Sequence, residues 1–148
     1  MPHFTLNIDP SGPVVNALVY VSEGRRTALE TEKLVVPAPR VIRALVDTGA
    51  SVTSIEPSVM QALGLTPTGT ADIVTPSTGT EVHTTDTYDV NFVILKNQNE
   101  PPLTMPNLRV AACQLFLKQG IHALIGRDVL SRCLLFYDGE RGVFSLAF

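Results

Sequence analysis

One stretch decides the expected fold, and it reads Val41-Ile42-Arg43-Ala44-Leu45-Val46-Asp47-Thr48-Gly49-Ala50-Ser51. Its first half is a mainly apolar run, Val41 to Val46, with the length and composition of a buried strand. The run leads Asp47 into a turn, because Gly49 allows a tight bend and a close backbone approach. A carboxylate held at the end of a strand is suited to acid–base chemistry on a bound substrate. The structural alternative is an aspartate that only stabilises the turn.

The size and composition of the chain predict an ordinary globular protein. With 148 residues, 45% of them hydrophobic, the chain can bury a core without disulfide bonds, and we expect one domain over residues 1–148. The net charge of −3 and the pI of about 5.5 give no basic surface of the kind that binds nucleic acid. The apolar content also fits a chain that buries surface against a partner.

Several features argue against other classes of protein. No apolar run approaches the ~18 residues that a membrane span needs, and residues 1–5 lack the basic and apolar regions of a secretory signal. The sequence therefore predicts a cytoplasmic protein that does not contact membranes. Cys113 and Cys133 are expected to be reduced thiols in or near the core. His3 and His83 show no metal-ligand spacing, so we expect neither a metal nor another cofactor.

Alternation of apolar and polar residues dominates the chain, which predicts an all-β fold. The expected strands are 4–8, 14–21, 41–46, 52–55, 88–95, 108–117, 122–125, 134–137 and 143–148. A short helix is expected over 57–64, with Met60 and Leu63 facing inward, and about one helical turn over 128–132. Residues 23–33 are polar and of mixed charge, and we interpret them as a solvated loop.

A long hairpin is expected between these elements. Residues 66–87 are rich in Thr, Ser, Gly and Pro but remain β-prone. Pro76-Ser77-Thr78-Gly79 has the composition of a hairpin tip, and residues 71–74 and 81–83 would form its arms.

A second motif, Ala123-Leu124-Ile125-Gly126-Arg127-Asp128, follows near the end of the chain. Alone it is a common packing element, but together with Asp47-Thr48-Gly49 it resembles the retropepsin-like aspartic proteases, the single-lobe, retroviral-type branch of the pepsin superfamily. The resemblance covers the order of elements over residues 41–148. It implies an all-β, closed barrel-like domain with a flap hairpin and one or two short helices. It also implies a homodimer, with one Asp-Thr-Gly per chain and the active site on the two-fold axis.

The resemblance assigns roles to single residues. Asp47 would be the catalytic aspartate, Thr48 would join a hydroxyl network between the two chains, and Gly49 would contact the substrate backbone. The expected substrate-binding residues are Leu45, Ala50, Ser51, Val52, Val74, Thr75, Pro76, Ser77, Thr78, Gly79, Leu124 and Ile125. The expected structural residues are Gly126, Arg127 and Asp128.

The chain departs from the retroviral pattern at Ser51. Retroviral members often have an acidic residue there, which pairs with the arginine that matches Arg127. Because Ser51 cannot form that ion pair, Arg127 must find another partner, either Asp128 or a backbone carbonyl.

Hydrolysis by this route needs two facing carboxylates, whereas the chain supplies only Asp47. Two such groups held close together cannot both ionise, so the pair shares one proton. The ionised partner takes a proton from the attacking water, and the protonated partner donates to the scissile carbonyl oxygen. We therefore expect a homodimer with a polypeptide substrate that adds as an extended strand. We expect the apolar strand 143–148 to pair across the dimer, the alternative being packing within its own chain.

Other functions remain to be weighed. The main alternative is a catalytically inactive dimeric module of the same fold that binds peptides or supports assembly. In such a module, Asp-Thr-Gly would be retained only because it forms the turn. A phosphoryl-transfer enzyme with Asp47 as nucleophile is disfavoured, since such sites want a second Asp where Gly49 stands. The alternating strand–helix pattern of a parallel sheet is also missing.

Overall fold

The structure, a computed structural model, describes residues 1–74, 79–95, 101–115 and 119–148. The elements in chain order are β1 His3–Asn7, β2 Val14–Val21, α1 Glu23–Thr31, β3 Arg40–Val46, β4 Ser54–Ile55, α2 Pro57–Ala62, β5 Gly69–Ile73, β6 His83–Ile94, β7 Leu103–Ala112, β8 Ala123–Ile125, α3 Arg127–Leu130, β9 Leu134–Asp138 and β10 Val143–Ala147. Strands dominate, as the alternation of apolar residues predicts. Within these ranges no helix is long and apolar enough to cross a membrane.

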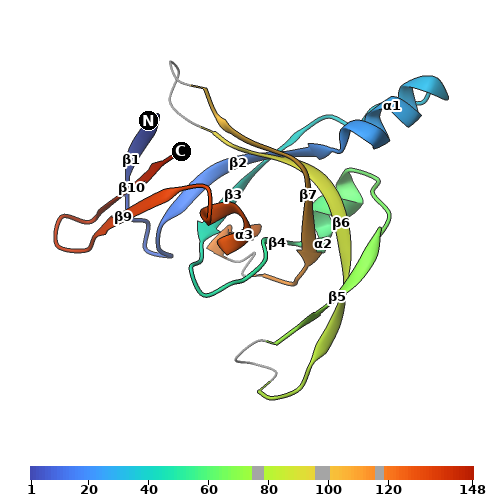
Figure 1. The fold of residues 1–148 in the computed structure, drawn as a ribbon. Helices are drawn as coiled ribbons and strands as arrows, with labels where there is room; N and C mark the ends of the chain where they lie inside the picture. The colour runs from blue at the N-terminus through green and yellow to red at the C-terminus, as the bar shows by residue number, and fades with distance from the viewer. Residues whose placement is uncertain (75–78, 96–100, 116–118) are drawn as a thin grey trace.

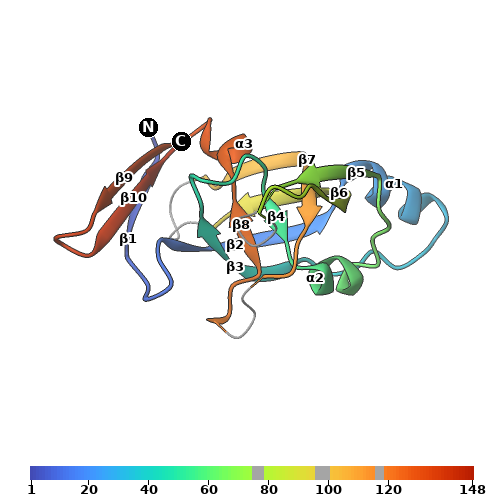
Figure 2. The same cartoon turned by 90° about the horizontal axis from the view of Figure 1, so that it is seen from below.

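Six strands close into a barrel (Figures 1 and 2). The strand order is β2-β3-β8-β4-β7-β6, and β6 pairs back onto β2, while β5 extends the sheet beyond β6 as the outer arm of a hairpin. The pairing of β3 with β8 is parallel, so strands far apart in sequence end at the same place. This closed, all-β barrel with a projecting hairpin confirms the fold that the sequence predicts.

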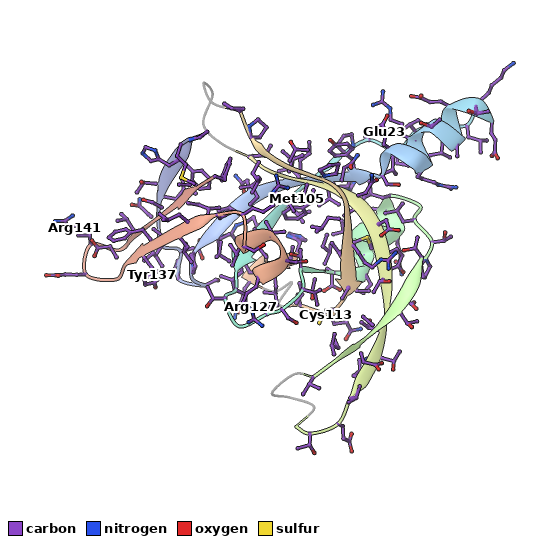
Figure 3. The ribbon with its side chains drawn as sticks, in the orientation of Figure 1. Glu23, Met105, Cys113, Arg127, Tyr137 and Arg141 are labelled. Carbon is purple, nitrogen blue, oxygen red and sulfur yellow. The ribbon has the colours of Figure 1, made fainter. Side chains whose placement is uncertain are left out.

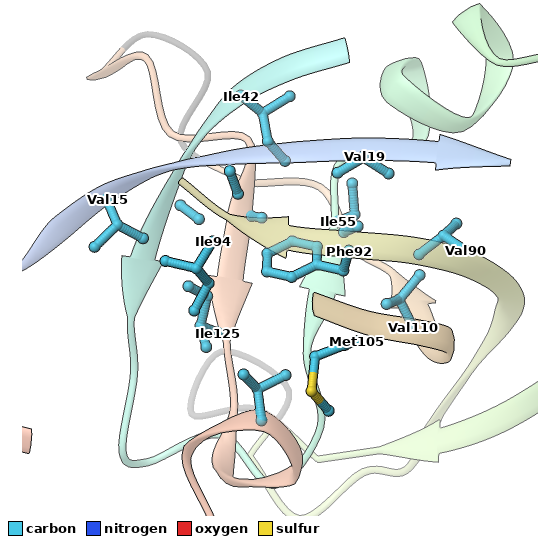
Figure 4. Close-up of a cluster of buried hydrophobic side chains, with 14 of the residues drawn as sticks. Val15, Val19, Ile42, Ile55, Val90, Phe92, Ile94, Met105, Val110 and Ile125 are labelled. Carbon is cyan, nitrogen blue, oxygen red and sulfur yellow. The ribbon is translucent and has the colours of Figure 1, made fainter. Parts of the chain in front are cut away.

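The interior of the barrel is filled by apolar side chains from facing strands (Figure 4). Val15 and Val19 of β2, Phe92 and Ile94 of β6, and Ile125 of β8 are each at most 1% exposed. Alternation along each strand turns every second residue inward. Complete burial of such a side chain contributes roughly 1.5–3 kcal/mol relative to leaving it exposed.

A second sheet, with strand order β1-β10-β9, packs beside the barrel. Phe4, Phe144 and Leu146 of this sheet belong to the same hydrophobic cluster as the barrel interior. The expected pairing of strand 143–148 across a dimer is wrong, because β10 has β1 on one side and β9 on the other. The strand is covered within its own chain, and Phe148 packs edge-to-face on Phe4 with ring centroids 6.3 Å apart.

The interpretation of residues 23–33 as a loop is also wrong, because they form α1. The hydroxyl oxygen of Ser22 caps this helix by accepting a hydrogen bond from the Arg25 backbone N–H at 3.3 Å. Arg26 and Glu30, one turn apart, form an ion pair at 3.1 Å. Leu29 alone is buried, so the sequence carries no apolar stripe that would have indicated a helix.

The boundaries of β6 and β7 differ from the expected ones. β6 is one strand from His83 to Ile94, and β7 covers 103–112 rather than 108–117. The last residues of the expected strand, 116–118, lie outside the described ranges. Pro106 and Asn107 interrupt the apolar pattern of β7, because they sit where the register with β6 shifts between Val90 and Phe92.

Asn91 holds this irregular place together. It is 4% exposed, and its side-chain amide donates to the Val21 carbonyl at 3.1 Å while its oxygen accepts the Asn107 N–H at 3.1 Å. Asn107 has a positive φ of 52°, so its N–H is directed away from the regular ladder. One buried amide thus ties β2, β6 and β7 together at the seam where the barrel closes.

Asn91→Ala is expected to lower the free energy of unfolding by about 1–3 kcal/mol, because it removes the partner of the buried Val21 carbonyl and of the part-buried Asn107 N–H. Urea unfolding followed by circular dichroism measures this loss. The control is Asn7→Ala, at an exposed position at the end of β1. Its free energy of unfolding should stay within about 0.5 kcal/mol of that of the parent. Equal stability of the two variants would contradict the role given to Asn91.

Candidate active site

The barrel places Asp47 at the point where β3 leaves the sheet. The parallel register sets Val46 beside Ile125, and the Asp47 N–H then donates to the Ile125 carbonyl at 3.0 Å. On the other side, the Val46 N–H donates to the Pro13 carbonyl at 2.9 Å. The main chain on which Asp47 sits is therefore fixed from both neighbouring segments.

The turn itself orients the Asp47 carboxylate. The Gly49 N–H donates to Asp47 Oδ1 at 2.9 Å, and the Ala50 N–H donates to the Asp47 carbonyl at 3.3 Å. A Cβ atom on Gly49 would lie 3.2 Å from Oδ1, so glycine lets the backbone approach this closely. Asp47 is half-buried and Thr48 and Gly49 are exposed. Among the described residues only Gly49 bonds the carboxylate, which leaves Oδ2 open to solvent or to a ligand.

The motif that contains α3 holds the turn from outside. The Arg127 guanidinium donates to the Thr48 carbonyl at 2.8 Å, and the Arg127 backbone N–H donates to the Ala50 carbonyl at 2.9 Å. Figure 3 shows Arg127 at the start of α3, beside the loop that follows β3. Of the two partners expected for Arg127, the backbone carbonyl is the one observed. Its hydrogen bonds to the turn fit the structural role that the sequence analysis gives Arg127.

Thr53 and Asp128 form the centre of this support. The Asp128 carboxylate accepts the Thr53 hydroxyl at 2.8 Å, the Thr53 N–H at 2.9 Å and the Val129 N–H at 2.9 Å. The Thr53 hydroxyl oxygen also accepts the Gly126 N–H at 3.1 Å. Thr53 is fully buried, so these bonds are shielded from water. We call this set of contacts the Thr53–Asp128 clasp.

Gly126 lets the two loops meet. A Cβ atom there would lie 2.5 Å from the backbone carbon of Val52 and 2.9 Å from the Thr53 nitrogen, which no side chain could tolerate without moving the main chain. This close approach is what allows the clasp to form. Sequence reasoning did not identify Thr53, because a single Thr within an apolar stretch is a common strand residue.

The expected substrate-binding residues fall into three groups. Ala50 and Leu124 are partly exposed, and Ser51 and Val52 are exposed, Val52 at 37%. Leu45 is half-buried and packs near Gly12, whereas Ile125 is fully buried in the core and is not accessible to a substrate in this chain. Of the hairpin residues, Val74 and Gly79 are exposed, and Thr75, Pro76, Ser77 and Thr78 lie outside the described ranges.

The expected hairpin is formed by β5 and β6. Ile73 pairs with His83 at the described end of the arms, and Thr84 donates to the Asp72 carboxylate across the strands at 2.7 Å. Thr85 donates to the Ala112 carbonyl at 2.6 Å, which ties the hairpin to the end of β7. The base of the hairpin is therefore anchored to the barrel while its outer part projects from it (Figure 1).

Other polar features lie away from the turn. A surface cavity of about 360 Å³ is lined by Leu6, Asn7, Ile8, Asp9, Val14, Asn16 and Arg43, and does not include Asp47. There the Ser11 N–H, followed by the Arg43 guanidinium, holds the pKa of Asp9 below its usual value.

Cys113 and Cys133 are free, and burial raises the pKa of both thiols, which keeps them protonated. The described ranges contain no cluster of three metal-ligating side chains.

Comparison with known proteins shows the family of the chain. Residues 38–129 match the model of a family described as aspartyl protease. The chain therefore belongs to the aspartyl protease family. Among solved structures, it is similar to a retropepsin-like aspartic protease from Rickettsia conorii, with a TM-score of 0.58 and 17% identity over 99% of this chain and 91% of that one. That likeness concerns the fold. No curated protein matches the chain.

Thr53→Val is expected to lower the free energy of unfolding by about 2–3 kcal/mol, because it leaves Asp128 and the Gly126 N–H without their buried hydroxyl partner. Valine has nearly the same shape, so the change isolates the hydrogen bonds. Thr53→Ser is the matched control, since it keeps the hydroxyl and removes one methyl group worth ~1 kcal/mol. Chemical denaturation of the three proteins gives the comparison, and a larger loss for serine than for valine would rule out the clasp as the source of stability.

Proposed function

We propose that the protein is a homodimeric aspartic endopeptidase in which Asp47 of each chain supplies one half of the catalytic pair. The observation that carries this proposal is the Asp47 carboxylate itself. It projects from a turn fixed by Ile125, Gly49 and Arg127, one oxygen is held by the Gly49 N–H, and the other oxygen is open. A group oriented in this way needs little reorganisation when a substrate arrives.

The proposed chemistry uses two such carboxylates around one water molecule. The ionised member removes a proton from the water, whose oxygen attacks the carbonyl carbon of the scissile peptide. The protonated member donates to the carbonyl oxygen, and a tetrahedral diol forms. Collapse of the diol breaks the carbon–nitrogen bond, the leaving amine takes the proton of the protonated carboxyl group, and a diol hydroxyl gives its proton to the other carboxylate. The products are a new carboxyl end and a new amino end, and the two carboxylates again share one proton.

A second copy of the chain is required because one chain offers one such turn. The edge strand β9 provides a candidate contact surface for that copy. Leu134, Phe136 and Tyr137 are 60%, 57% and 54% exposed there, and an apolar edge strand of this kind is prone to pair with another chain. β9 begins four residues after α3 ends, so a copy bound on it would lie near the element that supports Asp47.

The substrate is proposed to be an extended polypeptide. It would lie between the β5–β6 hairpin and the Asp47 turn and would add as a strand, with its backbone giving affinity and its side chains giving selectivity. Ser51, Val52, Leu124 and Val74 are the accessible residues that would contact it. This part of the proposal rests on their exposure and on the hairpin anchored to Ala112.

Asp47→Asn is expected to reduce peptide cleavage by about 10²- to 10⁴-fold, because it removes the general acid and base while keeping the shape of the side chain. The measurement is the rate of cleavage of a peptide library, read by mass spectrometry across acidic to neutral pH. The variant should retain the parental mass in solution and the parental free energy of unfolding.

Glu23→Gln, at an exposed position in the first turn of α1 and away from both β9 and the Asp47 turn, is the matched control and should leave the rate unchanged. Cleavage by the Asp47→Asn protein at the parental rate would refute the assignment. An intact wild-type dimer that cuts nothing at any pH would instead support the peptide-binding module.

Phe136→Asp is expected to raise the dissociation constant of the dimer at least about thirtyfold. This corresponds to the loss of an interface side chain that contributes ~2 kcal/mol to binding. Sedimentation equilibrium measures the dissociation constant directly. Val35→Asp introduces the same charge at a residue that is 90% exposed and lies in the α1–β3 connection, and should leave the dimer intact. If both variants dimerise like the parent, β9 is not the contact surface.

A further inference from the structure

One face of the large sheet runs without interruption from the strand that carries Asp47 to the hairpin. Directly paired residues of neighbouring strands point to the same face of a sheet. From β3 through β8, β4, β7 and β6 to β5, the register therefore places these residues on one face: Leu45, Leu124, Ser54, Ala111, Thr87 and Gly69. We call this set the outer row, because its sequence neighbours Ala44, Ala123 and Val110 belong to the hydrophobic cluster inside the barrel.

The same face continues along the hairpin toward its tip. Thr85 and His83 lie two and four residues before Thr87 in β6, so strand alternation keeps their side chains on the face of the outer row. His83 pairs with Ile73 of β5, which shares this face. Thr87 is 3% exposed, and the Thr85 hydroxyl donates to the Ala112 carbonyl, so this is the face that the hairpin turns toward the barrel.

The opposite face of the hairpin is turned to solvent. Asp72, Thr84 and Asp86 are exposed there, and Thr84 donates to the Asp72 carboxylate. His83 is exposed on the inward face, and within the described ranges it has no hydrogen-bond or ion-pair partner. A polypeptide held between the hairpin and the Asp47 turn would therefore meet an imidazole that nothing else in the described chain occupies.

We propose that His83 is a specificity-determining residue, which selects substrates with an acidic side chain, Asp or Glu, at the position held against the hairpin. The inference rests on the proposed function and names the class of its substrate. Histidine side chains ordinarily gain a proton and a positive charge between about pH 8 and pH 5. A protonated His83 would donate a charge-assisted hydrogen bond to the substrate carboxylate, while Ile73 packs on the methylene groups of the same side chain.

The symmetry of the proposed dimer doubles this requirement. Each chain contributes one hairpin, and a two-fold axis places the two hairpins equivalently on either side of the scissile bond. The preferred acidic residues are therefore expected at two matched positions, one on each side of the bond that is cut.

The charged groups of the hairpin do not cancel the charge of His83. Asp72 and Asp86 point to the other face, where they are exposed and where salt screens charges over about 8 Å. Glu81, two residues before His83, is exposed and lies outside the strand, and an exposed carboxylate in water attracts an imidazolium only weakly.

The charged groups of the barrel leave His83 available as well. Asp89 lies on the same face of β6 but forms an ion pair with Arg109 at 3.3 Å. Burial raises the pKa of the Cys113 thiol beyond the end of β7, which keeps it neutral. Asp47 faces the same substrate, but its titration affects the cleavage of every peptide and not the choice among peptides.

The experiment compares peptides that differ only by Glu or Gln at one position. A sequence that the wild-type enzyme cleaves is taken from a peptide library, and each position near the scissile bond is replaced in turn. At about pH 5.5, kcat/KM is expected to be about fivefold higher for Glu than for Gln at the two matched positions, as for an ion pair at the upper end of the range at protein surfaces. The ratio should fall toward one at about pH 8. Because both peptides are measured at the same pH, titration of the Asp47 pair cancels from the ratio.

Two substitutions of His83 separate its charge from its shape. His83→Gln should abolish the preference for Glu over Gln at both pH values. His83→Lys carries a positive charge throughout this pH range, so it should keep the preference at about pH 8, where the wild-type enzyme loses it. Asp86→Asn, on the opposite face of the hairpin, is the matched control and should retain the parental ratio at both pH values.

The outcomes distinguish this inference from the proposed function. Wild-type enzyme that cleaves the library but cuts Glu and Gln peptides equally at every position would overturn the inference alone. A preference for Glu that survives in His83→Gln would overturn it too, because the selection would then come from another residue. Enzyme that cleaves no peptide would overturn the proposed function and this inference with it.

Discussion

The Thr53–Asp128 clasp is the interaction on which the rest of the site depends. It joins the loop after β3 to the helix α3, and a half-buried carboxylate with three donors is a strong and directional connection. Because Gly126 has no side chain, the two loops lie against each other and the Arg127 backbone can bond the Asp47 turn. The clasp thus supports the turn in which the Gly49 N–H holds the Asp47 carboxylate.

The closed barrel gives this clasp its frame. Its parallel β3–β8 pair brings together two motifs that are far apart in the sequence, and its closing seam is held by the buried amide of Asn91. β6 serves both the barrel and the hairpin, so the rigid part of the strand anchors the projecting part. The molecule therefore combines a fixed carboxylate with a projecting arm whose base is tied to the barrel.

Much of this could be predicted from the sequence, because the decisive signals are local. A strand that ends in Asp47-Thr48-Gly49, the inward Met60 and Leu63 of α2, and the turn before β2 all follow from residue order alone. The partner of Asp128 could not be found, since Thr53 lies 75 residues away and carries no distinctive pattern. α1 was missed because its stability comes from a cap and an ion pair rather than from an apolar face.

The placement of β10 between β1 and β9 has a consequence for the folding of the protein during its synthesis. The strand at residues 3–7 pairs with the strand at residues 143–147, so the small sheet cannot assemble until residues 143–147 have been synthesised. Until then Phe4 lacks its neighbours Phe144 and Leu146, and the α3–β9 region is incomplete. The small sheet, and with it the edge strand β9, therefore takes its place late in the synthesis of the domain.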